Sequence, residues 1–446
     1  MADSSTLAIL VGGGPAPGIN GVIAAATIEA RNNRMEVIGF RDGFKWLVDK
    51  KVDWNEPRCP YYHRLDIGDV SDIALRGGSI LGTARTNPTK AAEDMEQVLH
   101  VFKHFNVKRL ITIGGDDTAY SGSQVYEKAA GAIHVAHVPK TIDNDLPLPE
   151  STPTFGFETA RHVGVGIVRN LAEDARTTSR WYVVVSMGRA AGFLALGIGK
   201  ASAATLTIIP EEFPVLPTAD AMDKPLRQLS LTHLCDIIIG SIVKRRRQKR
   251  PYGVVVLAEG LLEALGEDSL MAVEGLHKGR YGELERDPHG HLRLGEIEFG
   301  RMITDCLTDR MKAMNIKAAS FIDKDLGYEL RCADPVPFDA EYTRDLGYGA
   351  VKFLRSPKAG EYGAVISFEA GRLKPLPFQD MIIKETKRMR PRKVDVRGEV
   401  YEVARRYMIR LEPSDFEEPE LTSLAQSAGV STDEFRKLFG YLVGLK

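Results

Sequence analysis

Apolar residues near the start of the chain occur in short unbroken runs, and each run ends at glycine or at acidic residues. The segments between the runs place small and apolar residues at helical spacing. Unbroken runs of this length are typical of strands buried on both faces, and their alternation with helices predicts a parallel sheet. The strands are expected within 6–14, 35–44, 108–118 and 133–141, and the helices within 19–33 and 93–107.

A second set of such elements begins near residue 154. It contains a long helical stretch at 154–175 and apolar strands within 180–188 and 252–260. A chain of 446 residues exceeds the roughly 250 to 300 residues that one hydrophobic core usually supports. The sequence therefore predicts an α/β fold with two doubly wound α/β domains, whose ligands bind at the carboxyl ends of the strands. Near the C-terminus, Ser431 and Glu434 form a capping box that predicts a terminal helix.

The charge balance excludes several classes of partner. The formal net charge is -1, so there is no global basic field of the kind that attracts nucleic acid or anionic lipid, and any anion site must be local. The basic run at 244–250 is interpreted as a solvated helix end. Four cysteines without CxxC spacing and a start without a signal-like segment predict a cytoplasmic protein that does not enter a membrane.

The glycine-rich stretch VGGGPAPGIN, residues 11–20, follows a predicted strand and precedes a predicted helix. Backbone N–H groups in such a loop can approach an anion, and the helix N-terminus adds a favourable dipole. The spacing is not GxGxxG, and Pro15 and Pro17 stiffen the loop. A phosphate cradle and a tight structural turn both remain open for it.

The stretch IGGDDTAYSG, residues 113–122, ends a strand with two glycines and two aspartates. Carboxylate oxygens beside an exposed backbone suit Mg²⁺ bound together with phosphate oxygens. The alternative is that Asp117 caps a helix starting near Thr118.

The stretch PKTIDNDLP, residues 139–147, carries Asp143 and Asp145 at the end of another predicted strand. One carboxylate can accept a proton while the other holds a metal, although an Asx-rich turn would also explain the pair. Arginines, whose guanidinium groups are suited to binding phosphate, lie at the ends of other predicted elements. They are Arg85, Arg180, Arg189 and Arg331. Together these features indicate phosphoryl transfer.

In this order the motifs closely resemble the 6-phosphofructokinase family, and its pyrophosphate-dependent type in particular. The matching stretches are GGGPAPGIN, GTART, GGDDT, PKTIDND, FGFETA, SMGR, AEG and GYELRCADPVPFDAEYTRDLGYGA. The resemblance implies two α/β domains that face each other across a cleft. A donor (pyrophosphate)-binding domain is expected at 1–153 plus about 332–400. A sugar-phosphate-binding domain is expected at 154–331 plus part of the C-terminal region, with a surface insertion at about 261–300.

The same resemblance implies roles for residues of the first domain. Asp143 would be the base that accepts the proton of the sugar 1-hydroxyl, with Thr141 beside the transferred phosphoryl group. Asp116 and Asp145 would hold Mg²⁺. The donor would lie along Gly14 and Arg85.

For the sugar phosphate, the resemblance implies a second set of ligands. Met187, Gly188, Arg189 and Glu259 would contact the sugar. Arg180 would reach the sugar phosphate of a neighbouring subunit, which implies a homodimer or homotetramer. Arg331 would bind phosphate, Tyr328 stands where many members have histidine, and either Lys317 or Lys324 would supply a further cation.

The donor is indicated by two positions at which family members differ. Members that use ATP mostly have glycine where this chain has Asp117 and Lys140, whereas members that use pyrophosphate have aspartate and lysine there. A carboxylate at 117 would repel a nucleotide's inner phosphate by ~4 kcal/mol per close pair at an intermediate dielectric. The expected reaction is therefore reversible, Mg²⁺-dependent phosphoryl transfer from pyrophosphate to fructose 6-phosphate.

The sequence also leaves alternatives to this function. ATP as donor and a non-catalytic sugar-phosphate-binding subunit are the alternatives, and an oxidoreductase is disfavoured because the aspartates at the strand ends would have no role in hydride transfer. Allosteric effectors, use of sedoheptulose 7-phosphate and physiological direction are not readable from the residues.

Overall fold

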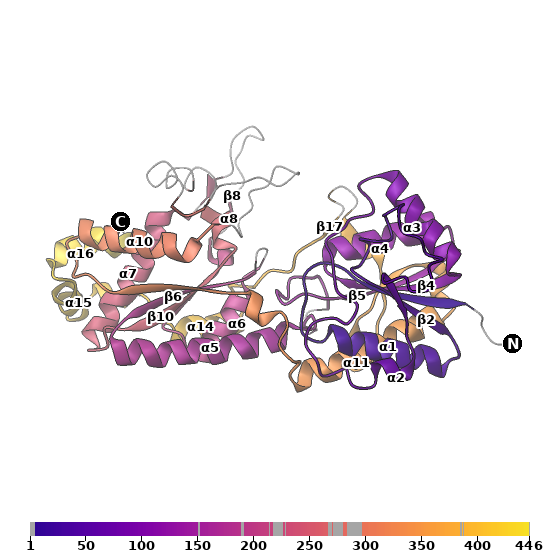
Figure 1. The fold of residues 1–446 in the computed structure, drawn as a ribbon. Helices are drawn as coiled ribbons and strands as arrows, with labels where there is room; N and C mark the ends of the chain where they lie inside the picture. The colour runs from indigo at the N-terminus through magenta and orange to yellow at the C-terminus, as the bar shows by residue number, and fades with distance from the viewer. Residues whose placement is uncertain are drawn as a thin grey trace. The chain divides into compact units, whose positions relative to one another are not determined.

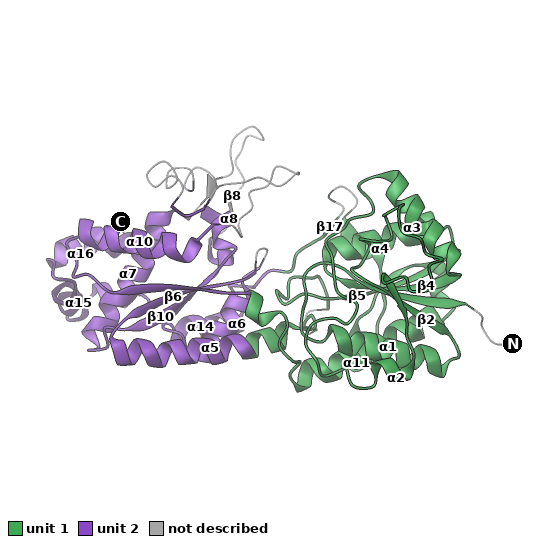
Figure 2. Ribbon diagram, viewed as in Figure 1, with its two compact units in different colours: residues 1–162, 328–392 green, residues 163–327, 393–446 purple. Residues whose placement is uncertain are grey.

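The structure is a computed structural model that describes residues 5–149, 152–188, 191–213, 215–216, 226–227, 229–265, 270, 280–282, 297–383, 386 and 388–445. It divides into two compact units, shown in Figure 2. Unit 1 comprises Met1–His162 and Tyr328–Arg392, and unit 2 comprises Val163–Gly327 and Lys393–Lys446. Each unit is described by itself.

Unit 1 is built on a seven-stranded sheet with the order β15-β12-β5-β4-β1-β2-β3. The strands β2, β1, β4, β5 and β12 are parallel, and the edge strands β3 and β15 are antiparallel to their neighbours. The strands are β1 Thr6–Val11, β2 Glu36–Phe40, β3 Tyr62–Arg64, β4 Val107–Gly114, β5 His134–Pro139, β12 Ala364–Val365 and β15 Leu376–Pro377. The helices are α1 Ile19–Asn32, α2 Ile67–Val70, α3 Ala92–His104, α4 Asp116–Lys128, α11 Pro337–Leu354, α12 Lys358–Glu361 and α13 Phe378–Met381.

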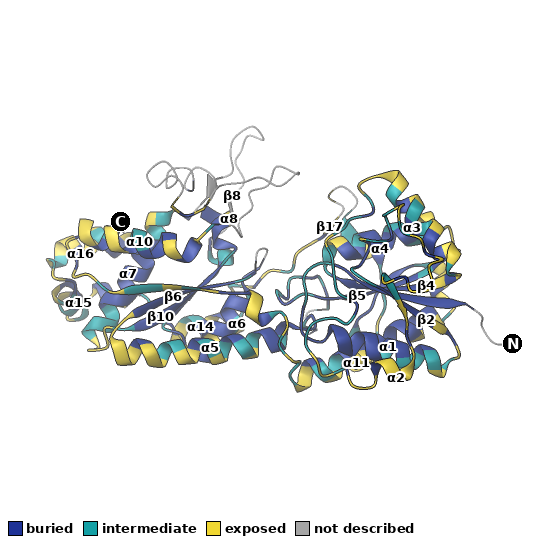
Figure 3. Cartoon of the chain, in the orientation of Figure 1, coloured by how far each residue is buried: buried dark blue, intermediate teal, exposed yellow. Residues whose placement is uncertain are grey.

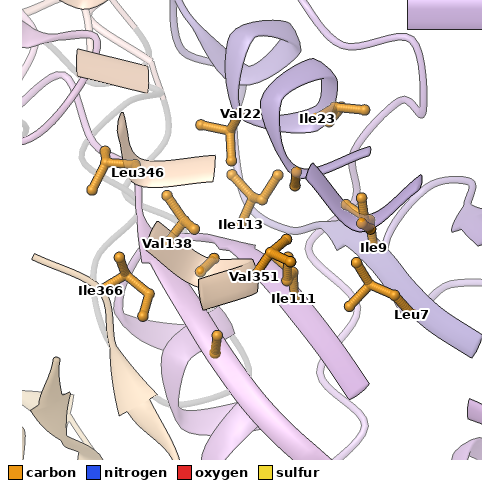
Figure 4. Close-up of a cluster of buried hydrophobic side chains, with 14 of the residues drawn as sticks. Leu7, Ile9, Val22, Ile23, Ile111, Ile113, Val138, Leu346, Val351 and Ile366 are labelled. Atoms are coloured by element: carbon orange, nitrogen blue, oxygen red, sulfur yellow. The ribbon is translucent and has the colours of Figure 1, made fainter. Parts of the chain in front are cut away.

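Helices cover both faces of this sheet (Figure 1). Successive residues of a strand point to opposite faces, so Leu7 and Ile9 pack with α1 and α11 while Ala8 and Leu10 pack with α3 and α4. Figure 4 shows the first of these two cores. Because both faces are covered, β1 is buried at every position, as Figure 3 shows. This explains why it reads as an unbroken apolar run.

Unit 2 contains a four-stranded parallel sheet with the order β11-β6-β10-β7. The strands are β6 Trp181–Ser186, β7 Leu206–Ile208, β10 Gly253–Ala258 and β11 Phe321–Leu326. The helices are α5 Phe157–Thr178, which begins in unit 1, and α6 Phe193–Ser202, α7 Leu231–Arg247, α8 Leu261–Leu265, α10 Phe299–Ala313, α14 Glu399–Tyr407, α15 Glu420–Ala428 and α16 Thr432–Phe439. The capping residue of the last helix is confirmed, since the Ser431 side chain accepts a hydrogen bond from the Glu434 N–H.

Short elements complete the two units. The two-residue strands are β8 Val215–Leu216, β9 Leu226–Arg227, β13 Phe368–Glu369, β14 Arg372–Leu373, β16 Ile382–Ile383 and β17 Arg388–Met389. The 3₁₀ helices are η1 Pro210–Glu212, η3 Tyr328–Leu330, η4 Pro413–Phe416 and η5 Gly440–Val443. No helix among the residues that the structure describes is long and apolar enough to cross a membrane.

The units divide at different residues from those predicted. The first break follows His162 rather than residue 153, and the chain leaves unit 1 for the last time after Arg392 rather than near residue 400. The first difference has a physical cause in α11. The buried carboxylate of Asp339 accepts hydrogen bonds from the N–H groups of Gly156 and Thr159, at 2.8 and 2.7 Å, and so fixes the start of α5 in unit 1.

Two further expectations concern the insertion at 261–300 and the basic run at 244–250. The predicted surface insertion at 261–300 lies largely outside the described residues and stays a prediction; its first residues form α8, in which Leu261, Leu262, Ala264 and Leu265 are buried. The basic run is not simply a solvated helix end. Three of its cations bind other segments: Lys244 Nζ donates to Asp415 Oδ2 at 2.6 Å, Arg246 Nη1 to Lys317 O at 2.6 Å, and Arg247 Nε to Ser423 Oγ at 3.0 Å.

Candidate active site

The glycine-rich loop after β1 is shaped by close backbone approaches. Gly13 has a φ of 81°, and a Cβ on Gly12 would lie 2.4 Å from Oγ1 of Thr118. The Gly12 N–H donates to Ile113 O at 2.8 Å and the Gly13 N–H donates to Ala84 O at 2.9 Å. These two amides are therefore engaged within the chain. Gly12 is thus held in a tight turn, whereas Gly13 and Gly14 both lie beside charged side chains, with Lys140 Nζ 3.4 Å from a Cβ placed on Gly13.

Two cations, Lys140 and Arg331, lie beside Gly14. Lys140, directly after β5, is 5% exposed, and its Nζ donates to the Gly14 carbonyl. The guanidinium carbon of Arg331 would lie 3.5 Å from a Cβ placed on Gly14. Burial, and then the charges of Arg331 and Arg85, lower the pKa of Lys140 to about 8, while Asp143 and Asp145 partly oppose this shift. The arrangement gathers positive charge beside the Gly14 backbone, which is suited to an anion.

Aspartates gather at the end of β4. The structure excludes capping by Asp117, because α4 begins at Asp116 and its N-cap residue is Gly115, without a side-chain cap. Asp116 Oδ1 accepts the N–H of Met389 at 2.7 Å. Burial chiefly, together with the carboxylates of Asp117 and Asp145, raises the pKa of Asp116 to about 6.

The chemistry of these carboxylates fits a divalent cation that is completed by substrate oxygens. The carboxylate of Asp145 contributes to the raised pKa of Asp116, and a cation between the two would relieve their repulsion. Among the described residues, no group of three or more acidic, histidine or cysteine side chains is placed to hold a metal. A two-carboxylate set is what Mg²⁺ uses when phosphate oxygens and water supply its other ligands.

The loop after β5 carries the candidate base. The Asp143 N–H donates to Thr141 Oγ1 at 3.0 Å, and Thr154 Oγ1 donates to Thr141 O at 2.7 Å. Asn144 between the two aspartates has a φ of 57°, and its Oδ1 accepts the Thr154 N–H at 3.0 Å. Threonine and asparagine side chains therefore take part in holding this turn.

Arg392 is a site residue that the sequence did not reveal. Its Nε donates to Asn144 O at 3.1 Å, its Nη1 to Thr152 O at 3.0 Å and its Nη2 to Asn144 Oδ1. The backbone N–H of Arg392 donates to Asp145 O at 2.7 Å. Its only signal in the sequence is the basic stretch KRMRPRK, residues 387–393, which matches none of the motifs above.

Residues predicted to bind the sugar lie at strand ends in unit 2. Met187 and Gly188 follow β6, and Glu259 follows β10, with the Gly188 N–H donating to Glu259 Oε2 at 3.4 Å. Arg189 lies outside the described residues. Arg180 is exposed and precedes β6, so the length of that strand separates it from Met187.

The remaining predicted cations lie as follows. Arg331 in unit 1 has its guanidinium carbon 4.9 Å from the ring centroid of Tyr328, which is 77% exposed. Lys317 is exposed, and Lys324 lies on β11 with its Nζ donating to Asp325 O at 2.6 Å. The choice between these two lysines stays open.

Glu211 of unit 2 is a second residue that sequence reasoning missed. Its Oε1 accepts the N–H of Gly192, at the start of α6, at 2.9 Å. The same atom accepts the N–H of Val394 at 3.2 Å. It therefore ties the segment that follows SMGR to the chain just beyond Arg392.

The chain is similar to known proteins that all belong to one family. The family described as "Phosphofructokinase" matches residues 6–354. A curated protein of Naegleria fowleri named pyrophosphate--fructose 6-phosphate 1-phosphotransferase is 50% identical over 98% of this chain and 96% of its own length. One of the same name from Thermotoga maritima is 48% identical over 98% of this chain and 99% of its own.

Solved structures agree on the fold. The pyrophosphate-dependent phosphofructokinase of Nitrosospira multiformis matches 99% of this chain and 93% of its own with a TM-score of 0.60 and 17% identity. A chain of Saccharomyces cerevisiae phosphofructokinase matches with a TM-score of 0.61 and 18% identity, and this chain spans about half (48%) of its length. These likenesses confirm the predicted α/β fold. With a family match over most of its length and full-length relatives at 48–50% identity, the chain belongs to the phosphofructokinase family.

Proposed function

We propose that this protein transfers a phosphoryl group from inorganic pyrophosphate to the 1-hydroxyl of fructose 6-phosphate, giving fructose 1,6-bisphosphate and phosphate. The observation that carries the proposal is the buried Lys140, which bonds the Gly14 carbonyl beside Arg331 and whose pKa is lowered further by the charge of Arg85. The names of the relatives at 48–50% identity support the same reaction.

The donor preference follows from charge and space. Lys140 places a cation where the outer part of a small, highly charged donor would lie, and Asp117 stands at the start of α4 on the same edge of the sheet. A nucleotide would bring a further phosphate and a ribose against that carboxylate, at ~4 kcal/mol per close charge pair. With pyrophosphate as donor, no nucleotide bond is broken or formed. The reaction is therefore expected to be reversible.

In the proposed chemistry Asp143 accepts the proton of the attacking hydroxyl, and Thr141 lies beside the transferred group. An aspartate is ionised at neutral pH and can serve as this acceptor. Lys140, Arg85, Arg331 and the Gly14 backbone hold the donor and neutralise charge on its phosphates. Asp116 and Asp145 would hold Mg²⁺, which when bound supplies charge neutralisation on the phosphate oxygens.

The sugar phosphate is assigned to Met187, Gly188, Arg189 and Glu259 of unit 2. We further propose that Arg180 serves a neighbouring subunit, because it lies at the opposite end of β6 from Met187. This implies a homodimer or homotetramer. The four cysteines, free where the structure describes them, support a cytoplasmic enzyme.

The test is a donor assay. Purified protein with Mg²⁺ and fructose 6-phosphate receives either pyrophosphate or ATP, and fructose 1,6-bisphosphate is followed. Turnover with pyrophosphate alone is expected. Turnover with ATP alone would keep Asp143 as base but overturn the roles given to Asp117 and Lys140, and silence with both donors would overturn the proposed reaction.

A double substitution tests the two donor residues directly. Asp117→Gly together with Lys140→Gly should lower kcat/KM for pyrophosphate and admit ATP. Loss of pyrophosphate turnover without any gain of ATP turnover would show that other residues set the donor.

A further inference from the structure

We propose that Arg392 is a positioning residue that holds the loop carrying Asp143 and Asp145 in its reactive shape. This inference rests on the proposed function in one respect, because kcat is measured for the proposed reaction. It assigns to a residue far along the chain a part in the phosphoryl-transfer site.

The first step is geometric. The described segments 141–149 and 152–154 are the outgoing and returning limbs of a loop that begins after β5, and Lys140 and Phe155 at its ends form a parallel bridge. Arg392 bonds both limbs of this loop, through Asn144 O and Oδ1 on the outgoing limb and Thr152 O on the returning limb. One guanidinium therefore fixes the distance between the two limbs.

The second step concerns the aspartates. Asn144 lies directly between Asp143 and Asp145, in a left-handed conformation that its own side chain helps to hold. The backbone N–H of Arg392 also binds the carbonyl of Asp145, at 2.7 Å. A shift of Asn144 must then carry both aspartates with it, and a misplacement of about 1 Å in such a site can cost on the order of 10²-fold in rate.

The third step is the choice of residue. Arginine offers five donors in a rigid planar fork, whereas lysine presents a point charge. Here the fork bonds two carbonyl oxygens, those of Asn144 and Thr152, and the side-chain oxygen of Asn144. Burial lowers the pKa of Arg392, and the charge of Asp145 opposes this shift. The three bonds to the loop thus hold a partly buried cation between its two limbs.

The experiment compares Arg392→Gln with Arg390→Gln. Arg390 is exposed and two residues away, so it is the matched control. We expect Arg392→Gln to lower kcat with pyrophosphate by about 10- to 100-fold, with the KM for fructose 6-phosphate within about threefold of the wild type. Hydrogen exchange should rise in peptides covering 141–155 and not elsewhere, while Arg390→Gln changes neither readout. Unchanged kcat, or unchanged exchange in 141–155, would overturn the proposal.

Chemical rescue separates positioning from general stability. In Arg392→Ala, guanidinium at millimolar concentration should restore part of the lost kcat, because it can refill the fork between the two limbs. Ammonium at equal concentration and ionic strength is the control and should restore none. Rescue by both ions alike, or by neither, counts against the proposal.

A second variant guards against failure to fold. Asn144→Gly preserves the left-handed backbone but removes the side-chain oxygen that Arg392 and Thr154 share. Its kcat should fall, and the double variant with Arg392→Gln should be less impaired than the two single effects multiplied. Strict additivity would overturn the inference. If the wild type fails with pyrophosphate, the proposed function falls, and the exchange in 141–155 still decides the role of Arg392.

Discussion

The buried Lys140 should make the stability of the ligand-free protein depend on pH in a defined direction. Its pKa is lowered from 10.5 to about 8, chiefly by burial. Between these two values the unfolded chain binds a proton that the folded chain does not, so stability rises as pH rises through this window. Below pH 8 the folded protein carries the full cost of the buried charge.

The magnitude follows from the size of the shift. One pKa unit corresponds to 1.36 kcal/mol, so the buried charge costs about 3 kcal/mol at neutral pH. Lys140→Met removes that cost but also leaves the Gly14 carbonyl without its donor, a loss of about 1.5–3 kcal/mol. The two terms nearly cancel at neutral pH. The informative quantity is therefore the difference in stability between variant and wild type as a function of pH.

The assay is thermal unfolding of both proteins between pH 7 and pH 9.5. Relative to the variant, the wild type should gain about 2 kcal/mol over the upper part of this range, or about 4–8 °C in Tm. Lys128→Met, at an exposed lysine, is the matched control and should show no such trend. A difference between Lys140→Met and wild type that stays constant with pH would refute the assignment of a buried, uncompensated charge to Lys140.

Two further predictions concern single carboxylates. Asp143→Ser should lower kcat by about 10²- to 10⁴-fold while leaving fructose 6-phosphate binding, measured by calorimetry, near the wild-type value; a normal kcat would remove Asp143 from the role of base. Asp339→Asn should destabilise the protein by about 3 kcal/mol in urea unfolding, because the amide cannot accept all the hydrogen bonds that Gly156 and Thr159 donate to the carboxylate. An unchanged unfolding curve would show that these bonds do not fix the start of α5.

The fold was predictable where a local pattern decides it. The buried runs of β1 and β4 and the helical spacing of α1 are local patterns, and the structure has these elements where they were expected. The division of the units was less predictable, because it depends on Asp339 reaching back across 180 residues to Thr159. The pattern of apolar and polar residues around Asp339 or around Thr159 does not indicate that the two side chains form a hydrogen bond. The basic run shows the same limit, since Lys244 looks solvated until the distant Asp415 is placed beside it.

The candidate site likewise contains residues that the sequence indicates and residues that it does not. Glycine, aspartate and lysine at strand ends are recognisable because each follows an apolar run, and the sheet then brings Gly14 and Lys140 to one edge. Arg392 follows no long strand, and its importance depends on which carbonyls the loop at 141–154 turns toward it. Sequence patterns reveal the groups that would touch a substrate more readily than the groups that hold them.

The charge distribution of unit 1 explains why these supporting bonds matter. In the cationic cluster, burial chiefly and then the charges of Arg331 and Arg85 lower the pKa of Lys140; in the acidic cluster, burial chiefly and then the charges of Asp117 and Asp145 raise the pKa of Asp116. Each cluster is stabilised by the charge it is suited to bind, an anion in one case and a divalent cation in the other. The charge-assisted hydrogen bonds that Arg392 donates to Asn144 and Thr152 hold the loop that carries Asp143 and Asp145 beside these like charges. A site prepared for a small, highly charged donor therefore needs a rigid support that is independent of the donor.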